Sequence, residues 1–488
     1  MDPFISAQYG YILLIVMGVL WVLLGYYFSK GVKDDEDFML AGRTVGLAMG
    51  TATVMATWVT ANTVLVAPEM TYRAGIWGMI AYSGAGLSLI LFGPLAIRIK
   101  RLMPKGVTSG DFMRSRYGEK TWLYYMFMAN VYNFAFMITQ AIGGGIILHL
   151  IFGIPFHIGA ISVILVCVVY TMLGGMRAVV GTDFIQTLLI MGAIVIIVPM
   201  AITHIGLANI YGGVLQDMPS RVNILYPLGL MYAFNGTIMA VGEVFHNNLW
   251  WVRAHSMREK VVRKGWTLGG IIWMAVPIVA GVTALAAISE GIDIPEIEMI
   301  FPLLTSTVIG SVAAILVSII VLSSLFTSLD SILAGVASLW AEDVYRVKIN
   351  PGASSHRMTT VNRYIIIILG ILTAVVALMR PGTMGEILYF SAAFVVPMIW
   401  PIIHGLYSKR ATTKAALSSM IIGPIVGMAS YIYISPFATA VIAGAVSLIV
   451  YFLVMFMDPG DFDWEDLQEL SLDKRLEKAE KNERKEAK

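Results

Sequence analysis

Hydroxyl side chains cluster in one otherwise apolar stretch of the sequence, residues 302–341. Six polar residues fall within nine positions there: Ser323, Ser324, Thr327, Ser328, Asp330 and Ser331. A small, hard cation such as sodium takes several oxygen ligands, which hydroxyls and backbone carbonyls supply without adding a net charge. A lone buried serine usually bonds to the carbonyl one turn back instead. The density of this cluster favours a cation site.

Two carboxylates also lie in apolar surroundings. Asp330 lies within the hydroxyl cluster, and Asp183 opens an apolar stretch after LGGMRAVVGT, where it is equally suited to capping a helix. If these stretches cross a membrane, a charge at their centre costs about 2.5–3.5 kcal/mol on insertion scales. Asp330 therefore needs a cation, a proton or a charged partner.

Two further segments combine polar groups with helix-breaking residues. Residues 45–70 contain Trp58, Asn62 and Pro68 among many small and hydroxyl residues. Residues 228–252 place four polar residues within six positions: Glu243, His246, Asn247 and Asn248. Interrupted membrane helices are tolerated where the freed backbone lines a cavity or an ion site, and polar side chains also bond across helix interfaces. Helix packing is the simpler account of Asn62 alone, whereas the cluster at 243–248 favours a function.

Thirteen apolar stretches make up almost all of the 488 residues and must position these groups. They cover residues 9–28, 45–70, 76–98, 122–151, 156–174, 182–204, 228–252, 266–288, 302–341, 362–380, 384–407, 414–434 and 437–457. A membrane-spanning helix needs about 20 mainly apolar residues. The composition agrees, because 58% of the residues are hydrophobic and only 13% are charged, about half the charge of a soluble fold. The sequence predicts an all-α polytopic membrane protein with about 13 transmembrane helices.

The basic residues predict how these helices are oriented. With the N-terminus outside, 30 of the 33 Lys and Arg residues fall on the cytoplasmic side, and only Arg73, Arg221 and Arg380 fall outside. Cytoplasmic loops hold such an excess of Lys and Arg. The first apolar stretch lacks a basic flank and a cleavage site, so we expect it to be retained. We expect a multi-pass protein of the cell membrane with a cytoplasmic C-terminus.

Several other classes of protein find no support in the sequence. The single cysteine, Cys167, excludes an internal disulfide and a cysteine metal cluster, and no nucleophile–base constellation indicates an enzyme. We expect no organic cofactor, no nucleic-acid partner and no obligatory protein partner. The lipid bilayer is the expected surroundings of the protein. The charge-rich run at 458–488 predicts a solvated cytoplasmic helix. Glu342 and Asp343, which lie near several arginines, indicate either an inner ionic latch or a solvated helix end.

Five segments resemble the sodium:solute symporter family. They are FMLAGRTVG, QAIGGGIIL, LGGMRAVVGTDFIQ, VFHNNLWWVRA and FTSLDSILAGVASLWAEDVYR, and the resemblance covers residues 9–457. The patterns GG-x-RAV-x-x-TD-x-IQ and S-x-x-x-ED-x-Y within them are long enough to be specific. The resemblance implies a LeuT-like five-plus-five inverted-repeat core of ten helices at 45–408. An extra helix and loop at 1–44 would precede it, and two helices at 409–457 and the tail at 458–488 would follow.

The resemblance to bacterial proline symporters implies a sodium site. Ala56, Val59 and Ser324 would offer backbone carbonyls, while Thr327 and Ser328 would offer hydroxyls. Some family members hold a second sodium with residues that match Asp183, Asp330 and Ser331. Asp330 replaces a hydroxyl in this sequence. The second position therefore suits either another cation or a proton.

The substrate helices resemble those of yeast and plant urea symporters, in TYRAGIWGMIAYSGAG and VFHNNLWWVRA. Aromatic faces and amides usually build a site for a small polar molecule. The candidates for solute contact are Trp58, Asn62, Tyr82, Gln140, Asn247, Asn248 and Trp250. Asn247 and Asn248 replace an Asp–Gln pair of the urea symporters. A urea-like amide and an amino acid such as proline both remain open as the solute.

The expected function is secondary active symport, in which inward sodium flow drives uptake of a small polar organic solute by alternating access. One alternative is proton-coupled symport that uses Asp330 or Glu243. An alternative of another class is a membrane receptor that senses the solute without moving it. A channel is disfavoured because the sequence has no repeated filter motif.

Overall fold

The computed structural model describes residues 3–294 and 296–468, and over these ranges the regular structure is helical apart from one bridge between Val45 and Met257. The first half contains α1 (Ala7–Ser29), α2 (Asp35–Leu40), α3 (Leu47–Trp58), α4 (Ala61–Ala74), α5 (Ile76–Gly84), α6 (Gly86–Leu102), α7 (Ser109–Tyr117), α8 (Glu119–Phe152), α9 (Phe156–Ile205) and α10 (Leu207–Asp217). The second half contains α11 (Pro227–His246), α12 (Asn248–Ser256), α13 (Glu259–Ser289), α14 (Ile300–Ile309), α15 (Ser311–Trp340), α16 (Ser355–Leu378), α17 (Met384–Val395), α18 (Ile399–Tyr407), α19 (Thr413–Tyr433), α20 (Thr439–Met457) and α21 (Glu465–Gln468).

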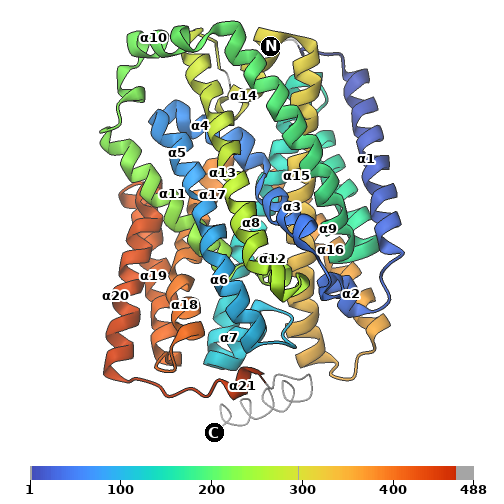
Figure 1. Ribbon diagram of the computed structural model, residues 1–488, viewed down its shortest axis with the longest axis vertical. Helices are drawn as coiled ribbons and strands as arrows, with labels where there is room; N and C mark the ends of the chain where they lie inside the picture. The colour runs from blue at the N-terminus through green and yellow to red at the C-terminus, as the bar shows by residue number, and fades with distance from the viewer. Residues whose placement is uncertain (1–2, 295, 469–488) are drawn as a thin grey trace.

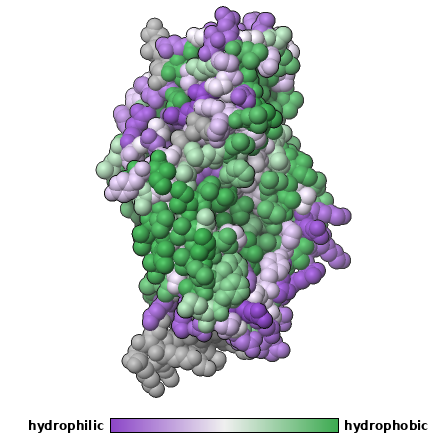
Figure 2. Space-filling model, turned by 90° about the vertical axis from the view of Figure 1, so that its left-hand side faces the viewer, coloured by the Kyte–Doolittle hydropathy of each residue, from purple (hydrophilic) through white to green (hydrophobic). Residues whose placement is uncertain are grey.

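The long helices run close to one common direction. Figure 1 shows α10 lying across one end of the bundle, with α2, α7 and α21 at the other end. Figure 2 shows apolar residues covering the middle of one face and hydrophilic residues gathering toward both ends. A bilayer requires this distribution, because its core cannot hydrogen-bond to polar groups. The prediction of an all-α membrane protein is confirmed.

The described helices account for thirteen passes across a membrane. Ten helical segments are long and apolar enough to cross a membrane, and one of them, α9, has 50 residues. Gly175 interrupts α9 with φ 54° and ψ −141°, and a Cβ atom there would lie 2.4 Å from the carbonyl oxygen of Phe38. Only glycine fits such a fold-back point. Two passes by α9 and one by each of the broken pairs α3–α4 and α11–α12 bring the total to thirteen.

The break between α3 and α4 follows from the backbone at Val59. This residue has φ −79° and ψ 80°, which is not helical, and it ends α3. Thr60 then caps α4, since its side chain accepts a hydrogen bond from the Thr63 amide while the Thr63 hydroxyl accepts one from the Thr60 amide. The capping box satisfies donors that the break would otherwise leave buried without partners. The break is therefore stable inside the bundle.

The break between α11 and α12 uses an asparagine in the same way. Asn247 has an extended backbone, with φ −74° and ψ 123°, and its side chain accepts a hydrogen bond from the Leu249 amide at 3.2 Å. The side-chain nitrogen Nδ2 of Asn247 donates to the side-chain oxygen Oδ1 of Asn133 in α8 at 2.8 Å. The two segments in which the sequence combines polar groups with helix-breaking residues, 45–70 and 228–252, are thus each broken in the middle.

Two boundaries differ from the sequence-based expectation. The predicted single stretch at 302–341 is divided at Gly310, whose φ of 94° ends α14 before α15 begins. Apolarity alone does not reveal such a turn, because both helices are equally hydrophobic. The start of the predicted solvated tail is packed, since Arg116 lies over the Phe462 ring at 4.1 Å and Arg98 over the Trp464 ring at 5.0 Å. Residues 469–488 of that tail lie outside the described residues.

Candidate ion and solute sites

Hydroxyls of α15 face the break at the end of α3. The Ser328 hydroxyl donates to the Thr57 carbonyl at 3.3 Å and to the Ser324 carbonyl at 2.9 Å. Ala56 and Val59 lie on either side of Thr57 and Trp58, and Val59 is the residue at which the helix stops. All of these side chains are buried. Of the residues predicted to bind sodium, Ser328 and Ser324 of α15 thus lie at Thr57 of α3, which is next to Ala56 and two positions before Val59, whereas the Thr327 hydroxyl donates to Asp183. Sodium binding by these five residues stays a prediction.

The oxygen atoms at this place suit a small cation. The Ser324 hydroxyl donates to the Ile320 carbonyl at 2.7 Å, and the Ser324 carbonyl accepts from the Ser328 hydroxyl at 2.9 Å, so an ion at this carbonyl would replace the Ser328 hydrogen bond. A broken helix frees further main-chain carbonyls, and the hydroxyls add oxygen without charge. Such oxygens are of the kind that a small, hard cation takes as ligands.

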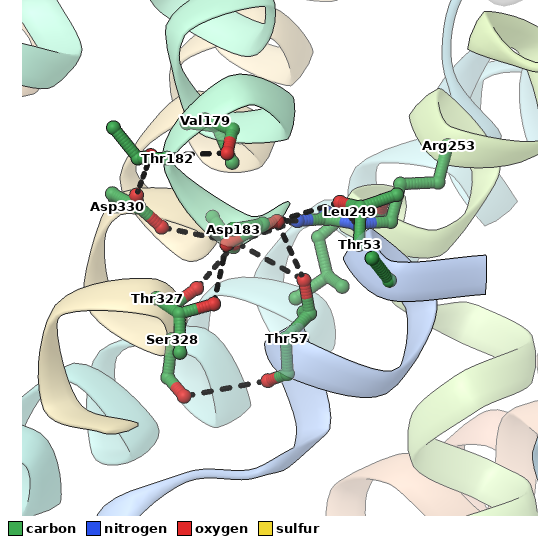
Figure 3. Close-up of polar contacts among 12 residues, drawn as sticks. Thr53, Thr57, Val179, Thr182, Asp183, Leu249, Arg253, Thr327, Ser328 and Asp330 are labelled. Carbon is green, nitrogen blue, oxygen red and sulfur yellow. Dashed lines mark hydrogen bonds and ion pairs between the residues drawn. The ribbon is translucent and has the colours of Figure 1, made fainter. Parts of the chain in front are cut away.

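Asp183 of α9 connects this place to a second polar cluster (Figure 3). Its carboxylate accepts hydrogen bonds from Thr53 at 2.6 Å and from the Thr327 hydroxyl. Arg253 of α12 lies opposite, with a guanidinium nitrogen 3.2 Å from the same carboxylate. Asp183 and Arg253 are both fully buried. Thr327 therefore belongs both to the predicted sodium ligands and to this ion pair.

Arg253 occupies the middle of the residues predicted to hold a second cation. Besides Asp183, its guanidinium donates to the Ser331 hydroxyl at 2.6 Å, to the Thr53 hydroxyl at 3.2 Å and to the Leu249 carbonyl at 3.2 Å. An arginine is a permanent cation with five donors in a fixed plane. A positive charge supplied by the protein itself thus lies against Asp183 and Ser331.

Asp330 lies next to this pair and has partners of its own. It accepts hydrogen bonds from the Tyr170 hydroxyl at 2.7 Å, from Ser331 at 3.1 Å and from Thr182 at 3.5 Å. It is fully buried, and Ser331 is the side chain that contacts both Asp330 and Arg253. If both carboxylates are ionised, the cluster of Asp183, Asp330 and Arg253 has a net charge of −1, which one cation or one proton would balance.

A central cavity opens beside the break in α3. It holds about 590 Å³ of space not filled by atoms. Trp58, the last residue of α3, and Tyr82 of α5 line it, as do Tyr132 and Phe136 of α8, Glu243 of α11 and Tyr389 of α17. Pockets that combine aromatic walls with a few polar groups are the usual sites for small organic molecules.

The predicted solute contacts divide into two groups. Trp58 and Tyr82 line the cavity, and Trp250 packs on Trp58 with ring centroids 5.4 Å apart. The Trp250 indole also donates to the Glu243 carboxylate at 3.1 Å. These three aromatic residues are therefore gathered at or directly behind the cavity wall.

The four amide candidates lie elsewhere and bond to the protein itself. Asn62 donates to Thr139 at 3.3 Å, Gln140 donates to the same hydroxyl at 3.1 Å, and Asn247 caps α12. Asn248 accepts a hydrogen bond from the Ser109 amide at 2.8 Å and donates to the Gly335 carbonyl at 2.7 Å, so it joins α7, α12 and α15. None of the four is among the described residues that line the cavity. Their role in solute binding stays a prediction.

Sequence reasoning did not select several residues that the geometry brings forward. Tyr132, Phe136 and Tyr389 line the cavity, but in the sequence they look like ordinary aromatic residues of apolar helices. The charge count places Arg253 among the cytoplasmic basic residues, whereas the structure buries it fully. The available signal for Arg253 was its place in VFHNNLWWVRA, six positions after Asn247 and directly after the apolar stretch at 228–252.

Together, the broken helices, the buried hydroxyls between α3 and α15 and the central cavity are typical of a membrane transporter of the LeuT-like class. Solved structures with this fold support the class. A Na+-coupled sialic acid symporter aligns with a TM-score of 0.77 at 19% identity over 93% of this chain and 99% of that one. Mhp1, a nucleobase-cation-symport-1 family transporter, aligns with a TM-score of 0.53 at 13% identity over 91% of this chain and 98% of that one. At these identities the likeness shows the fold alone.

The chain belongs to the sodium:solute symporter family, whose model matches residues 38–423. It is similar to the urea-proton symporter DUR3 of Oryza sativa subsp. japonica, with 23% identity over 89% of this chain and 66% of the rice protein. It is also similar to the high-affinity proline transporter PutP of Bacillus subtilis, with 25% identity over 82% of this chain and 88% of that protein. The high-affinity choline transporter 1 of Caenorhabditis elegans is 25% identical over 86% of this chain and 76% of that protein. The resemblance to symporters is confirmed, and the protein is a transporter rather than an enzyme.

Proposed function

We propose that this protein couples inward sodium flow to the uptake of a small polar organic solute. The observation that carries the proposal is the contact between the Ser328 hydroxyl of α15 and the Thr57 carbonyl beside the α3 break, with the Thr327 hydroxyl one position away in the chain. A cation bound there by oxygens from both helices would hold α3 and α15 together. Trp58 ends α3 and lines the cavity, so the ion would also fix a residue at the solute site. A ligand shifts an equilibrium only by its differential affinity for the two states, and a site built from two helices would give sodium such a difference wherever the helices separate in the other state.

The relatives suggest which solutes to test first. Their names describe carriers of urea, proline and choline. A urea-like amide and an amino acid such as proline are therefore the starting candidates.

We further propose that a single cation is coupled. The Arg253 guanidinium lies against Asp183 and Ser331, where a second sodium was expected to bind. Two cations at one carboxylate repel each other in a medium of low polarity. The remaining charge of the cluster would then be balanced by one sodium at the α3 break.

Proton coupling is the second candidate, because of one specific observation. Asp330 stands where the second sodium site of some family members has a hydroxyl, and it accepts hydrogen bonds only from neutral side chains among its described partners. The rice relative is named a urea-proton symporter. A proton on Asp330 would remove a buried charge as a bound cation would, and Glu243 is the other carboxylate open to this role.

Uptake by proteoliposomes that contain the purified protein separates the two candidates. Radiolabelled urea and proline are offered under an inward sodium gradient, an inward proton gradient, or neither. We expect sodium to drive accumulation, and we expect Thr327→Ala with Ser328→Ala to weaken the apparent sodium affinity at least about tenfold, because two ligands to a charge are lost. Ser318→Ala is the matched control, since this buried serine of α15 only bonds back to the Ala314 carbonyl.

Accumulation driven by a proton gradient alone would overturn sodium coupling. If this accumulation survives the double change but is lost in Asp330→Asn, the coupling belongs to Asp330.

A further inference from the structure

The central cavity has a chemical character that the sodium site does not explain. Five of its lining side chains are aromatic: Trp58, Tyr82, Tyr132, Phe136 and Tyr389. The faces of aromatic rings carry partial negative charge and attract cations, most strongly when water is excluded. Trp273 extends this wall from behind, with its ring 5.2 Å from Trp58 and 6.1 Å from Tyr82.

Glu243 is the one charged side chain among the described residues that line this cavity. Its side chain is 3% exposed, and the Trp250 indole donates to one of its carboxylate oxygens at 3.1 Å. Tyr132 is the other residue that bonds to this carboxylate. Both partners are neutral. The described lining contains no lysine, arginine or histidine, so an ionised Glu243 has no countercharge within the wall.

The basic residues nearest to this part of the bundle are already engaged. Arg253 pairs with Asp183 at 3.2 Å, and Arg73 pairs with Glu69 at 3.0 Å. A buried carboxylate without a countercharge is costly, and a bound cation relieves that cost. The cavity is therefore complementary to positive charge.

We propose that the solute is a small organic cation with N–H groups, of the ammonium or guanidinium class. This inference rests on the proposed symport and narrows its solute. The cation would lie among the aromatic side chains while its N–H groups donate to the Glu243 carboxylate, a charge-assisted hydrogen bond. Tyrosine hydroxyls of the wall would accept the remaining N–H groups.

The same wall is poorly matched to the two starting candidates. The carboxylate of an amino acid would enter a cavity that already holds one carboxylate, with no basic side chain in the described lining to receive it. A neutral amide such as urea can donate to Glu243, but it gains neither the charge pairing nor the attraction to the aromatic faces. Charge, more than shape, should therefore decide which solute binds.

Two pairs of near-isosteric probes isolate the effect of charge. Guanidinium and urea share a planar, three-branched shape, as do aminoguanidinium and semicarbazide, and only the first of each pair is positively charged at neutral pH. Binding of each to the purified full-length protein is measured by calorimetry at saturating sodium and at millimolar probe concentrations, with potassium chloride holding the ionic strength constant. We expect each cation to bind at least about tenfold more tightly than its neutral partner, the contribution of one charge-assisted contact.

Variants of Glu243 test whether its carboxylate causes the preference for the cation over its neutral partner. Glu243→Gln should reduce the preference for the cation to less than about threefold, and Glu243→Asp should retain most of it, because a neutral amide is a weaker acceptor for a charged donor. Glu69→Gln is the matched control: Glu69 is also buried, but it pairs with Arg73 and is not part of the cavity wall. If Glu69→Gln lowers the preference as much as Glu243→Gln does, Glu243 is not the partner of the cation and the assignment fails.

The wild-type comparison tests the proposal even if no variant folds. Equal binding within each pair, tighter binding of urea and semicarbazide, or no binding of either cation would overturn it.

Sodium-gradient uptake measured with the same probes separates the cationic solute from the symport itself. Urea that is accumulated with sodium while guanidinium does not bind contradicts the cationic solute and leaves the symport intact. Guanidinium that binds tightly but does not move under any gradient contradicts the symport and leaves the cation site intact.

Discussion

Two adjacent residues of α15 show how the ion site and the buried charges are connected at the scale of single residues. Ser328 bonds only to main-chain carbonyls in the structure, whereas Thr327 donates to Asp183. Through Asp183, Thr327 is one hydrogen bond away from Arg253. A sodium ion that takes the Thr327 hydroxyl as a ligand would leave its proton directed at Asp183, so the ion site and the ion pair stabilise each other.

The Asp183–Arg253 pair should be a strong and cooperative contact. Removing one partner of a buried pair leaves an uncompensated charge and typically costs about 3–5 kcal/mol, so we expect Asp183→Asn and Arg253→Gln each to lower the free energy of unfolding by such an amount. The double variant should lose clearly less than the sum of the two. A double-mutant cycle measured by unfolding in detergent micelles checks this.

The exposed pair of Lys414 and Asp458 is the control for that cycle. Its atoms are 2.7 Å apart, but the two side chains are 76% and 57% exposed, so we expect a coupling of at most about 1 kcal/mol. Additive effects of Asp183→Asn and Arg253→Gln would show that the two charges do not form a stabilising pair.

Residue types alone predicted part of the site. The hydroxyls of α15 stood out because they are dense in an apolar stretch, and the structure places them at the α3 break. The amides did not show their roles, because the partners of Asn248 lie 139 positions away at Ser109 and 87 positions away at Gly335. Contacts between distant parts of the chain depend on the packing of the helices, which the local pattern does not contain.

At the scale of helices, an ion pair at the end opposite α10 joins α7 to Ala341–Ile349, the segment that extends α15. The Arg114 guanidinium contacts the Asp343 carboxylate at 3.5 Å and the Asp343 carbonyl at 2.8 Å, and the Thr108 hydroxyl donates to the same carboxylate at 2.6 Å. Asp343 and Glu342 are fully buried, so this part of the chain is not a solvated helix end. The geometry suits the inner ionic latch that the sequence left as one of two readings.

Weakening this contact should loosen α7. We expect Asp343→Asn to raise amide hydrogen exchange in 107–117 at least about tenfold, because the Asp343 carboxylate no longer accepts from Thr108 and Arg114 keeps only Glu119 as a charged partner. Hydrogen-exchange mass spectrometry of the purified protein measures this directly. Glu259→Gln, which removes an exposed partner of Arg101, should leave the same peptide unchanged. Equal exchange in wild type and Asp343→Asn would contradict the latch.

Apolar stretches predicted the number and rough position of the helices better than their breaks. Length and hydropathy are sufficient to identify a helix that crosses a bilayer, and the thirteen passes follow from them. The breaks at Val59 and Asn247 depend on single backbone angles that hydrogen bonds to other helices support. The turn at Gly310 depends on a positive φ in the middle of a uniformly apolar run.

At the scale of the whole molecule, the basic loops gather at one end. Residues of the α2 segment, the loop before α7 and the extension of α15, including Arg43, Lys105 and Arg346, line one common pocket. Figure 1 shows α2, α7 and α21 at this end and α10 at the opposite end. By the excess of positive charge, we propose that this end faces the cytoplasm and that the N-terminus lies outside. The division into an outer helix, a ten-helix core at 45–408 and two further helices stays a prediction.

Single introduced cysteines test this orientation. Cys167 is buried and should not react, so Ser220→Cys, between α10 and α11, and Gly352→Cys, before α16, can each be read alone. We expect a membrane-impermeant maleimide to label Ser220→Cys in intact cells and Gly352→Cys only after the membrane is made permeable. Labelling of Gly352→Cys in intact cells with protection of Ser220→Cys would show the inverse orientation.

The central claim is that one sodium ion binds between α3 and α15, and equilibrium binding of radioactive sodium to the purified protein tests it without knowledge of the solute. We predict saturable binding of one ion per chain, displaced by excess unlabelled sodium but not by potassium, and weakened at least about tenfold by Thr327→Ala with Ser328→Ala. Ser318→Ala should bind like the wild type. Absence of saturable binding by a wild-type protein that still transports its solute, or binding that the double change leaves intact, would contradict the account.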